Sequence, residues 1–166
     1  MSILIVYYSR TGNTQLLSNH LANELGADLE ALHDGRDWIS SWGTIQAALA
    51  SVLGGNSRLA PLGKNLSDYQ LILIGTPVWV GRPSVPIRTF IKMYRRQLPN
   101  VAFFCTQQGE GGKNVMNTMQ SLARRVPVAR LVLREGDLAG IHENTDADRF
   151  VDTIRTFTKD QITQPA

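Results

Sequence analysis

The sequence predicts an α/β protein, a three-layer α/β/α sandwich built on a five-stranded parallel sheet. Short apolar segments, which suit strands buried on both faces of a sheet, alternate with segments whose apolar residues recur at helical spacing. Strands that alternate with helices are joined in parallel by helical crossovers, and the helices then cover both faces of the sheet. All 166 residues are expected to form a single domain, 1–166, by length.

The chain opens with the strand expected to lie at the centre of the sheet. Residues 3–9 carry no charge, and five of these seven residues are aromatic or β-branched. The hydroxyl-rich turn SRTGNT follows, and leucines at helical spacing then predict a helix, with Asn13 or Thr14 as its N-terminal cap and Gly26 as its end. A helix start leaves N–H groups unpaired and carries partial positive charge. The order strand, turn, helix therefore indicates an anion site.

The next three segments are expected to form an edge strand, a helix and a loop. Residues 27–32 alternate between polar and apolar side chains, as an edge strand does. Residues 37–53 follow a helical period that aligns Trp38 and Trp42, which are interpreted as packing residues of the core or of a homodimer surface. Residues 56–67 have the composition of a loop. The remaining strands are expected at 71–74, 101–105 and 128–133, and the remaining helices at 87–94, 115–123 and 150–157.

Two later loops match the first turn in position. TPVWVG (76–81) follows the strand at 71–74, and TQQGEGG (106–112) follows the strand at 101–105. In open parallel sheets, ligands bind beyond the carboxyl ends of the strands, where the strand order reverses. All three loops are expected at that end, so the sequence predicts that they converge on one site.

Composition excludes several classes of function. No apolar run approaches the ~20 residues that a membrane span needs, and no signal peptide is recognised, so a cytoplasmic location is expected. The net charge of +3 is mild, and the basic segment 82–96 is interpreted as a solvated helix face rather than a nucleic-acid site. Cys105 is expected to be an inert, buried thiol with a raised pKa. His20, His33 and His142 lack metal-ligand spacing, so no metal is expected.

The first turn narrows the choice of anion. It lacks both the GxxxxGKS/T pattern of nucleotide-triphosphate loops and the GxGxxG pattern of dinucleotide sites. No acidic pair ends the first strand, and Cys105 lies on another strand, which disfavours a phospho-acceptor domain and a cysteine phosphatase. The hydroxyls of SRTGNT suit one terminal phosphate, and a simple helix cap is the alternative interpretation.

The three motifs SRTGNT, TPVWVG and TQQGEGG together resemble the flavodoxin family in its short form, and the resemblance covers essentially the whole chain. It implies an FMN-binding flavodoxin-like fold with strand order 2-1-3-4-5. It also implies that hydroxyls and amides of the first turn hold the FMN phosphate. Trp79 would then lie beside the isoalloxazine ring or stack on it. Gly81 would belong to the peptide that reorients towards flavin N5. The implied cofactor-binding residues are Ser9, Arg10, Thr11, Gly12, Asn13 and Thr14, then Thr76, Pro77, Val78, Trp79, Val80 and Gly81, and finally Thr106, Gln107, Gln108 and Gly109.

Two departures from the family pattern bear on function. The chain is mildly basic, with Arg82 just after the second motif, which predicts a less negative reduction potential than an acidic electron carrier shows. Gln107 and Gln108 stand where an aromatic that stacks on the outer flavin face is common, so that face is expected to be open to a substrate or a nicotinamide. Glu110 either approaches the flavin or is solvated. For the helix expected at 37–53, an alternative to packing alone is that it covers the flavin edge.

Three functions remain open from the sequence. The first is an electron-transfer flavoprotein that works between redox partner proteins. The second is an FMN-dependent reductase that passes hydride from NAD(P)H to a quinone or a similar acceptor. The third is a non-redox module that binds an anion.

Overall fold

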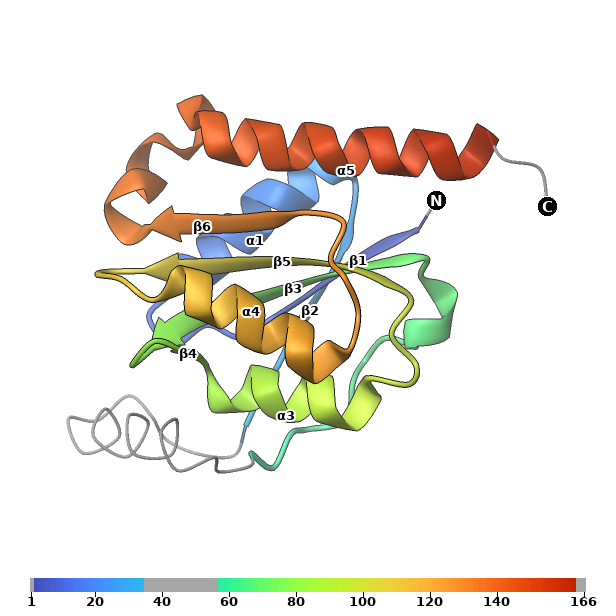
Figure 1. Cartoon of the computed structure of the whole chain (residues 1–166), viewed down its shortest axis with the longest axis horizontal. Helices are drawn as coiled ribbons and strands as arrows, with labels where there is room; N and C mark the ends of the chain where they lie inside the picture. The colour runs from blue at the N-terminus through green and yellow to red at the C-terminus, as the bar shows by residue number, and fades with distance from the viewer. Residues whose placement is uncertain (1, 35–56, 164–166) are drawn as a thin grey trace.

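A parallel sheet between two layers of helices organises the chain (Figure 1). The computed structural model describes residues 2–34 and 57–163. Five parallel strands follow the order β2-β1-β3-β5-β6, and the two-residue strand β4 pairs antiparallel with β3. The strands are β1 (Ile3–Tyr7), β2 (Asp28–Ala31), β3 (Leu71–Trp79), β4 (Arg82–Pro83), β5 (Asn100–Gln107) and β6 (Arg130–Arg134). The helices are α1 (Asn13–Leu25), α3 (Val85–Tyr94), α4 (Gly112–Ala123) and α5 (Thr145–Thr163). Two 3₁₀ segments are η1 (Leu66–Asp68) and η2 (Glu135–Glu143).

This topology confirms the predicted sandwich and its strand order, because β5 and β6 are the fourth and fifth parallel strands. β1 lies between β2 and β3, so Leu4 pairs with Asp28 on one side and with Ile72 on the other. The chain order of the strands reverses between β1 and β3, which is where such sheets bind ligands. The helix expected at 37–53, with Trp38 and Trp42, lies outside the described residues.

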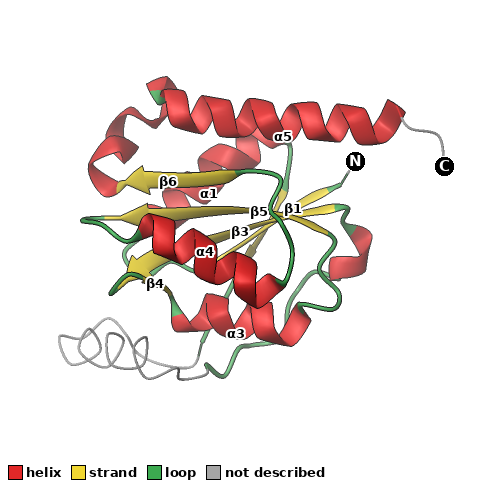
Figure 2. Cartoon of the chain, viewed as in Figure 1, coloured by secondary structure: helices red, strands yellow, loops and turns green. Residues whose placement is uncertain are grey.

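The core divides into two apolar clusters, one on each face of the sheet. In Figure 1, α3 and α4 lie in front of the sheet and α1 lies behind it, and Figure 2 shows the same layers by secondary structure. Phe90 of α3 and Phe103 of β5 belong to the front cluster, while Leu21 of α1, Phe104 and Ile154 of α5 belong to the other. Neighbouring residues Phe103 and Phe104 point to opposite faces, as the period of two in a strand requires.

Strand β3 is longer than the predicted segment 71–74. The glycine and proline after that segment indicate a turn, but β3 continues to Trp79, because residues 75–77 pair with β5 and the last two residues pair with β4. Val78 pairs with Pro83 and Trp79 pairs with Arg82. The second motif is therefore the end of a strand and a hairpin turn, not a loop throughout.

The boundaries of the last two strands also differ from prediction. Thr106 and Gln107, expected in the third loop, are the last residues of β5, because they pair with Leu133 and Arg134 of β6. Polar side chains at the end of a strand hide this extension from an argument based on apolar runs. β6 begins at Arg130 rather than at residue 128.

The ends of α1 are set by two glycines. Gly12, not Asn13 or Thr14, is the N-terminal cap, with a φ of 95° that favours glycine. Gly26 ends the helix as predicted, in the left-handed conformation with its N–H bonded to the carbonyl of Ala22. None of the helices in residues 2–34 and 57–163 has the length and apolar character needed to cross a membrane.

Candidate functional site

The turn after β1 leaves the start of α1 open to an anion. The Gly12 N–H donates to the Ser9 hydroxyl at 3.1 Å, and the first helical bond runs from the Leu16 N–H to the Gly12 carbonyl at 2.8 Å. The N–H groups of residues 13–15 thus precede the first helical bond, and no side-chain cap is found among the described residues. This turn offers backbone N–H donors, the helix field and the hydroxyls of Ser9 and Thr11.

Thr14 ties this turn to the third motif. Thr14 and Thr106 are each 1% exposed, and their hydroxyls share a hydrogen bond of 2.8 Å across 92 positions of sequence. The Thr14 carbonyl also accepts from the Ser18 hydroxyl at 2.7 Å. The hydroxyl of Thr14 therefore has a protein partner, and its contact with a phosphate stays a prediction.

Thr76 has a structural role in the second motif. Its side chain is fully buried, and its hydroxyl accepts from the Ser84 N–H at 2.9 Å. This bond closes the base of the β3–β4 hairpin. At the tip, Val80 and Gly81 have φ values of 50° and 68°, as both central residues of a type I′ turn do. Val80 is a β-branched residue in a conformation that costs such residues energy, and it is 62% exposed.

The second and third motifs pack directly against each other. Gly111 has a φ of 114°, and a Cβ on it would lie 2.8 Å from the Cα of Gly81. Real Cβ atoms do not approach backbone this closely, so glycine at position 111 lets the third loop touch the hairpin tip.

Trp79, in the second motif, packs beside the first turn and is 9% exposed. The ring of Tyr8 meets it edge-on, with centroids 5.6 Å apart and an interplanar angle of 89°. The guanidinium carbon of Arg10 lies 5.7 Å from its centroid, within cation–π range. Burial, followed by the charge of Asp34, raises the pKa of Tyr8, so that ring stays neutral. These contacts hold the indole in one orientation.

A hollow of about 210 Å³ opens where the motifs meet. It confirms the predicted convergence of the three loops, since each contributes to its lining. Arg10 is a cation of the lining and Glu110 and Glu135 are its carboxylates, whereas Arg82 lies outside it and is exposed. The lining consists of Arg10, Thr11, Pro77, Val78, Trp79, Val80, Gly81, Gln107, Gln108, Gly109, Glu110 and Glu135.

The remaining predicted residues sit around the hollow or below it. Ser9, Gly12 and Asn13 belong to the turn at the start of α1, and Thr14, Thr76 and Thr106 form the buried supports described above. Sequence reasoning missed Glu135, the first residue of η2. It follows β6 directly, so the rule that placed the other loops at the carboxyl ends of strands also covers it.

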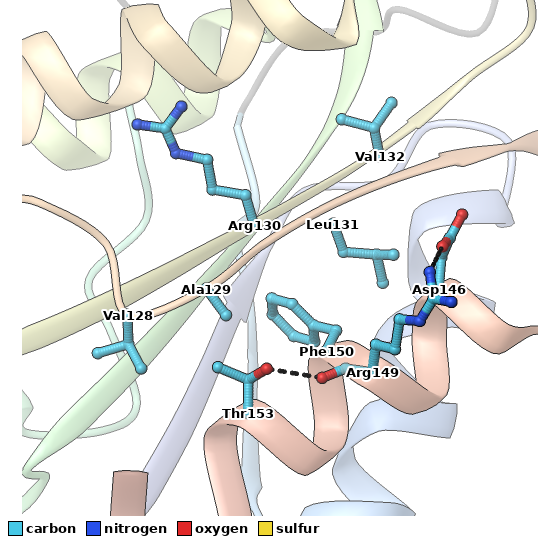
Figure 3. A pocket seen from close by; sticks show the side chains of 9 residues that line it. All are labelled: Val128, Ala129, Arg130, Leu131, Val132, Asp146, Arg149, Phe150 and Thr153. Atoms are coloured by element: carbon cyan, nitrogen blue, oxygen red, sulfur yellow. Dashed lines mark hydrogen bonds and ion pairs between the residues drawn. The ribbon is translucent and has the colours of Figure 1, made fainter. Parts of the chain in front are cut away.

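A larger hollow of about 500 Å³ lies elsewhere, between β6 and α5 (Figure 3). Its wall includes an ion pair between Arg149 and Asp146 with a nitrogen–oxygen distance of 3.5 Å. Both side chains are largely exposed, so this ion pair contributes little to the stability of the fold. None of the predicted site residues lines this hollow.

Cys105, His20 and His142 do not line the hollow. Cys105 is fully buried in β5, and burial raises the pKa of its thiol to about 12, as expected for an inert cysteine. His20 and His142, which are far apart in sequence, lie with ring centroids 5.0 Å apart. Burial, and then the neighbouring His142, lowers the pKa of His20.

Comparison with known sequences identifies the family. A family profile described as Flavodoxin matches residues 2–154. The chain belongs to the flavodoxin family. No curated protein sequence matches this flavodoxin.

Solved structures share the fold. A flavoprotein from Lactobacillus acidophilus, in complex with FMN, is 25% identical over 84% of this chain and 97% of its own, with a TM-score of 0.66. A WrbA-like flavodoxin from Agrobacterium tumefaciens is 19% identical over 93% and 98% of the two chains, with a TM-score of 0.57. The two-electron reduced flavodoxin of Megasphaera elsdenii is 16% identical over 91% and 96%, also with a TM-score of 0.57.

Proposed function

We propose that this flavodoxin binds FMN and acts in electron transfer. The observation that carries the proposal is the convergence of three loops on one hollow at the switch point of the sheet, beside a helix start that is open to an anion. The FMN complex of the related Lactobacillus acidophilus flavoprotein supports the choice of cofactor.

The donor set fits FMN in two parts. The N–H groups of residues 13–15 and the hydroxyls of Ser9 and Thr11 suit the phosphate, and the field of α1 makes a basic side chain unnecessary there. The hollow of about 210 Å³ is too small for a whole nucleotide but suits a planar ring against Trp79. Bound FMN supplies reversible transfer of one or two electrons.

The chain's own residues would position the cofactor. Arg10 and Tyr8 hold the indole of Trp79, and the hairpin tip at Val80 and Gly81 forms one wall of the hollow. The buried Thr14–Thr106 bond fixes the distance between the phosphate turn and the third loop. The side chain of Arg82 is exposed next to this wall, where it would favour an anionic reduced flavin.

A second candidate function is an FMN-dependent reductase that takes hydride from NAD(P)H and passes it to a quinone. The third loop favours it, because Gln107, Gln108 and Gly109 border the hollow where an aromatic would otherwise cover the ring. In the first candidate function, the protein shuttles electrons between redox partner proteins. We propose a cytoplasmic location for either function.

The test begins with the purified protein, which is expected to be yellow and to release FMN on denaturation. A Thr11→Val variant is expected to bind FMN about 2- to 10-fold more weakly, through loss of one hydroxyl contact, with unchanged stability because Thr11 is exposed. Steady-state NADPH oxidation with a quinone separates the two functions, since a carrier gives no turnover. A colourless protein that takes up no FMN would refute both and support an anion-binding module.

A further inference from the structure

Gln107 connects the hollow to the start of α4. Its Oε1 accepts the backbone N–H of Gly112, the first residue of α4, at 2.8 Å. A backbone N–H can only donate, so the atom facing it must be the amide oxygen and not the nitrogen. This bond therefore fixes which end of the Gln107 amide faces the helix.

The glycine at position 112 is what permits this arrangement. A Cβ there would lie 2.8 Å from Gln107 Oε1 and would overlap the side chain of Val132. The helix start thus approaches the amide closely, and the amide takes the place of an ordinary N-terminal cap. With its oxygen engaged, Gln107 has only its NH₂ group left to offer.

That NH₂ group borders the hollow. Gln107 lines the hollow, and within residues 2–34 and 57–163 its amide nitrogen donates to no protein acceptor. A half-buried donor without a protein partner costs free energy unless water or a ligand accepts its protons.

We infer that Gln107 is a specificity residue that donates a hydrogen bond from its NH₂ group to an acceptor on the ring of the bound flavin. The inference rests on the proposed binding of FMN. The ring system of a flavin presents carbonyl oxygens and ring nitrogens as acceptors along one edge. A site built to donate to such a group discriminates against rings that lack it, because its donor would then stay unpaired.

The competing interpretation is that Gln107 only caps α4. Two substitutions separate the roles. Gln107→Glu keeps an oxygen that accepts the Gly112 N–H but removes the NH₂ donor, whereas Gln107→Met removes both. Gln97→Glu is the matched charge control, because Gln97 is exposed and lies just before β5, at the opposite end of the sheet.

The experiment measures thermal stability of the apoproteins and dissociation constants for FMN and for riboflavin, which lacks the phosphate. Gln107→Glu is expected to keep the melting temperature of the apoprotein. It is expected to raise the dissociation constants for FMN and for riboflavin about tenfold or more. Gln107→Met is expected to lose affinity for both flavins as well and to lower the melting temperature by about 2–4 °C through loss of the cap. Gln97→Glu is expected to match the wild type.

The spectrum and reduction potential of the bound flavin give a second readout that a purely structural cap would not move. Gln107→Glu is expected to shift the visible absorption bands and to make the potential more negative, because a carboxylate beside the ring opposes negative charge on the reduced flavin. Equal flavin affinities in Gln107→Glu and Gln97→Glu would overturn the inference. A lower affinity of Gln107→Glu for FMN with an unchanged affinity for riboflavin would also overturn it, because the substitution would then act on the phosphate and not on the ring. Wild-type protein that binds neither flavin would instead refute the proposed function.

Discussion

The hydrogen bond between Thr14 and Thr106 can be tested by a double-mutant cycle. Both hydroxyls are 1% exposed and 2.8 Å apart, so replacing either residue with Val strands the other hydroxyl without water or a protein partner. A stranded buried hydroxyl costs about 1–3 kcal/mol. In a chain of 166 residues, each kcal/mol corresponds to about 2–4 °C in melting temperature.

The two single variants and the Thr14→Val/Thr106→Val double variant are compared by urea and thermal unfolding of the apoprotein. Each single change is expected to cost about 1–2 kcal/mol, and the double variant no more than one single change, because it strands no hydroxyl. Thr118→Val is the control, since the Thr118 hydroxyl is exposed and bonds only to the carbonyl of Asn114 in its own helix. Costs of the two single changes that simply add in the double variant would show that the bond does not couple the two motifs.

Other predictions follow from single buried groups and from the hairpin tip. Cys105 is expected to resist alkylation in the native protein at pH 8 and to react only on unfolding, since its pKa is about 12. Because the pKa of His20 is lowered in the folded protein, the unfolded chain takes up a proton first as the pH falls, so the free energy of unfolding is expected to be full above about pH 6.5 and to decrease below it. In urea titrations, His20→Gln is expected to flatten this pH dependence, and His142→Gln tests the contribution of the neighbouring histidine. Gly75→Ala is expected to destabilise the apoprotein by about 1–3 kcal/mol or more in unfolding experiments, because its Cβ would overlap a buried aromatic ring. Val80→Asn is expected to raise the melting temperature by about 2–4 °C, because Asn-Gly suits a type I′ turn that strains a β-branched residue.

Much of the fold could be predicted from the sequence because its signals are local and strong. The uncharged segment at 3–9 became the central strand β1, and the alternating segment at 27–32 became the edge strand β2. Apolar residues at helical spacing gave the positions of α1 and α4 within a few residues. These signals follow from burial on two faces, one face or one stripe.

The candidate site was predictable in its location but not in its detailed contacts. Gly75 and Pro77 indicate a turn, yet β3 runs on to Trp79, since pairing with β5 and then with β4 outweighs those local preferences. The polar residues of the third motif were expected as ligand contacts, whereas Thr106 is buried in a bond to Thr14. Such roles depend on which distant residue lies opposite, and a single sequence carries no local trace of that.

The close approach of Gly111 to Gly81 has a consequence for protein engineering. The third loop touches the backbone of the hairpin tip at position 111, so a third loop from another flavodoxin fits against this hairpin only if it carries glycine there. A donor third loop without that glycine would push the hairpin away, whereas a Cβ at position 81 would meet open space and is disfavoured only by the φ of 68° there. Transplants of residues 106–112 that aim to change what the hollow binds should therefore keep glycine at position 111 or bring residues 76–83 with them.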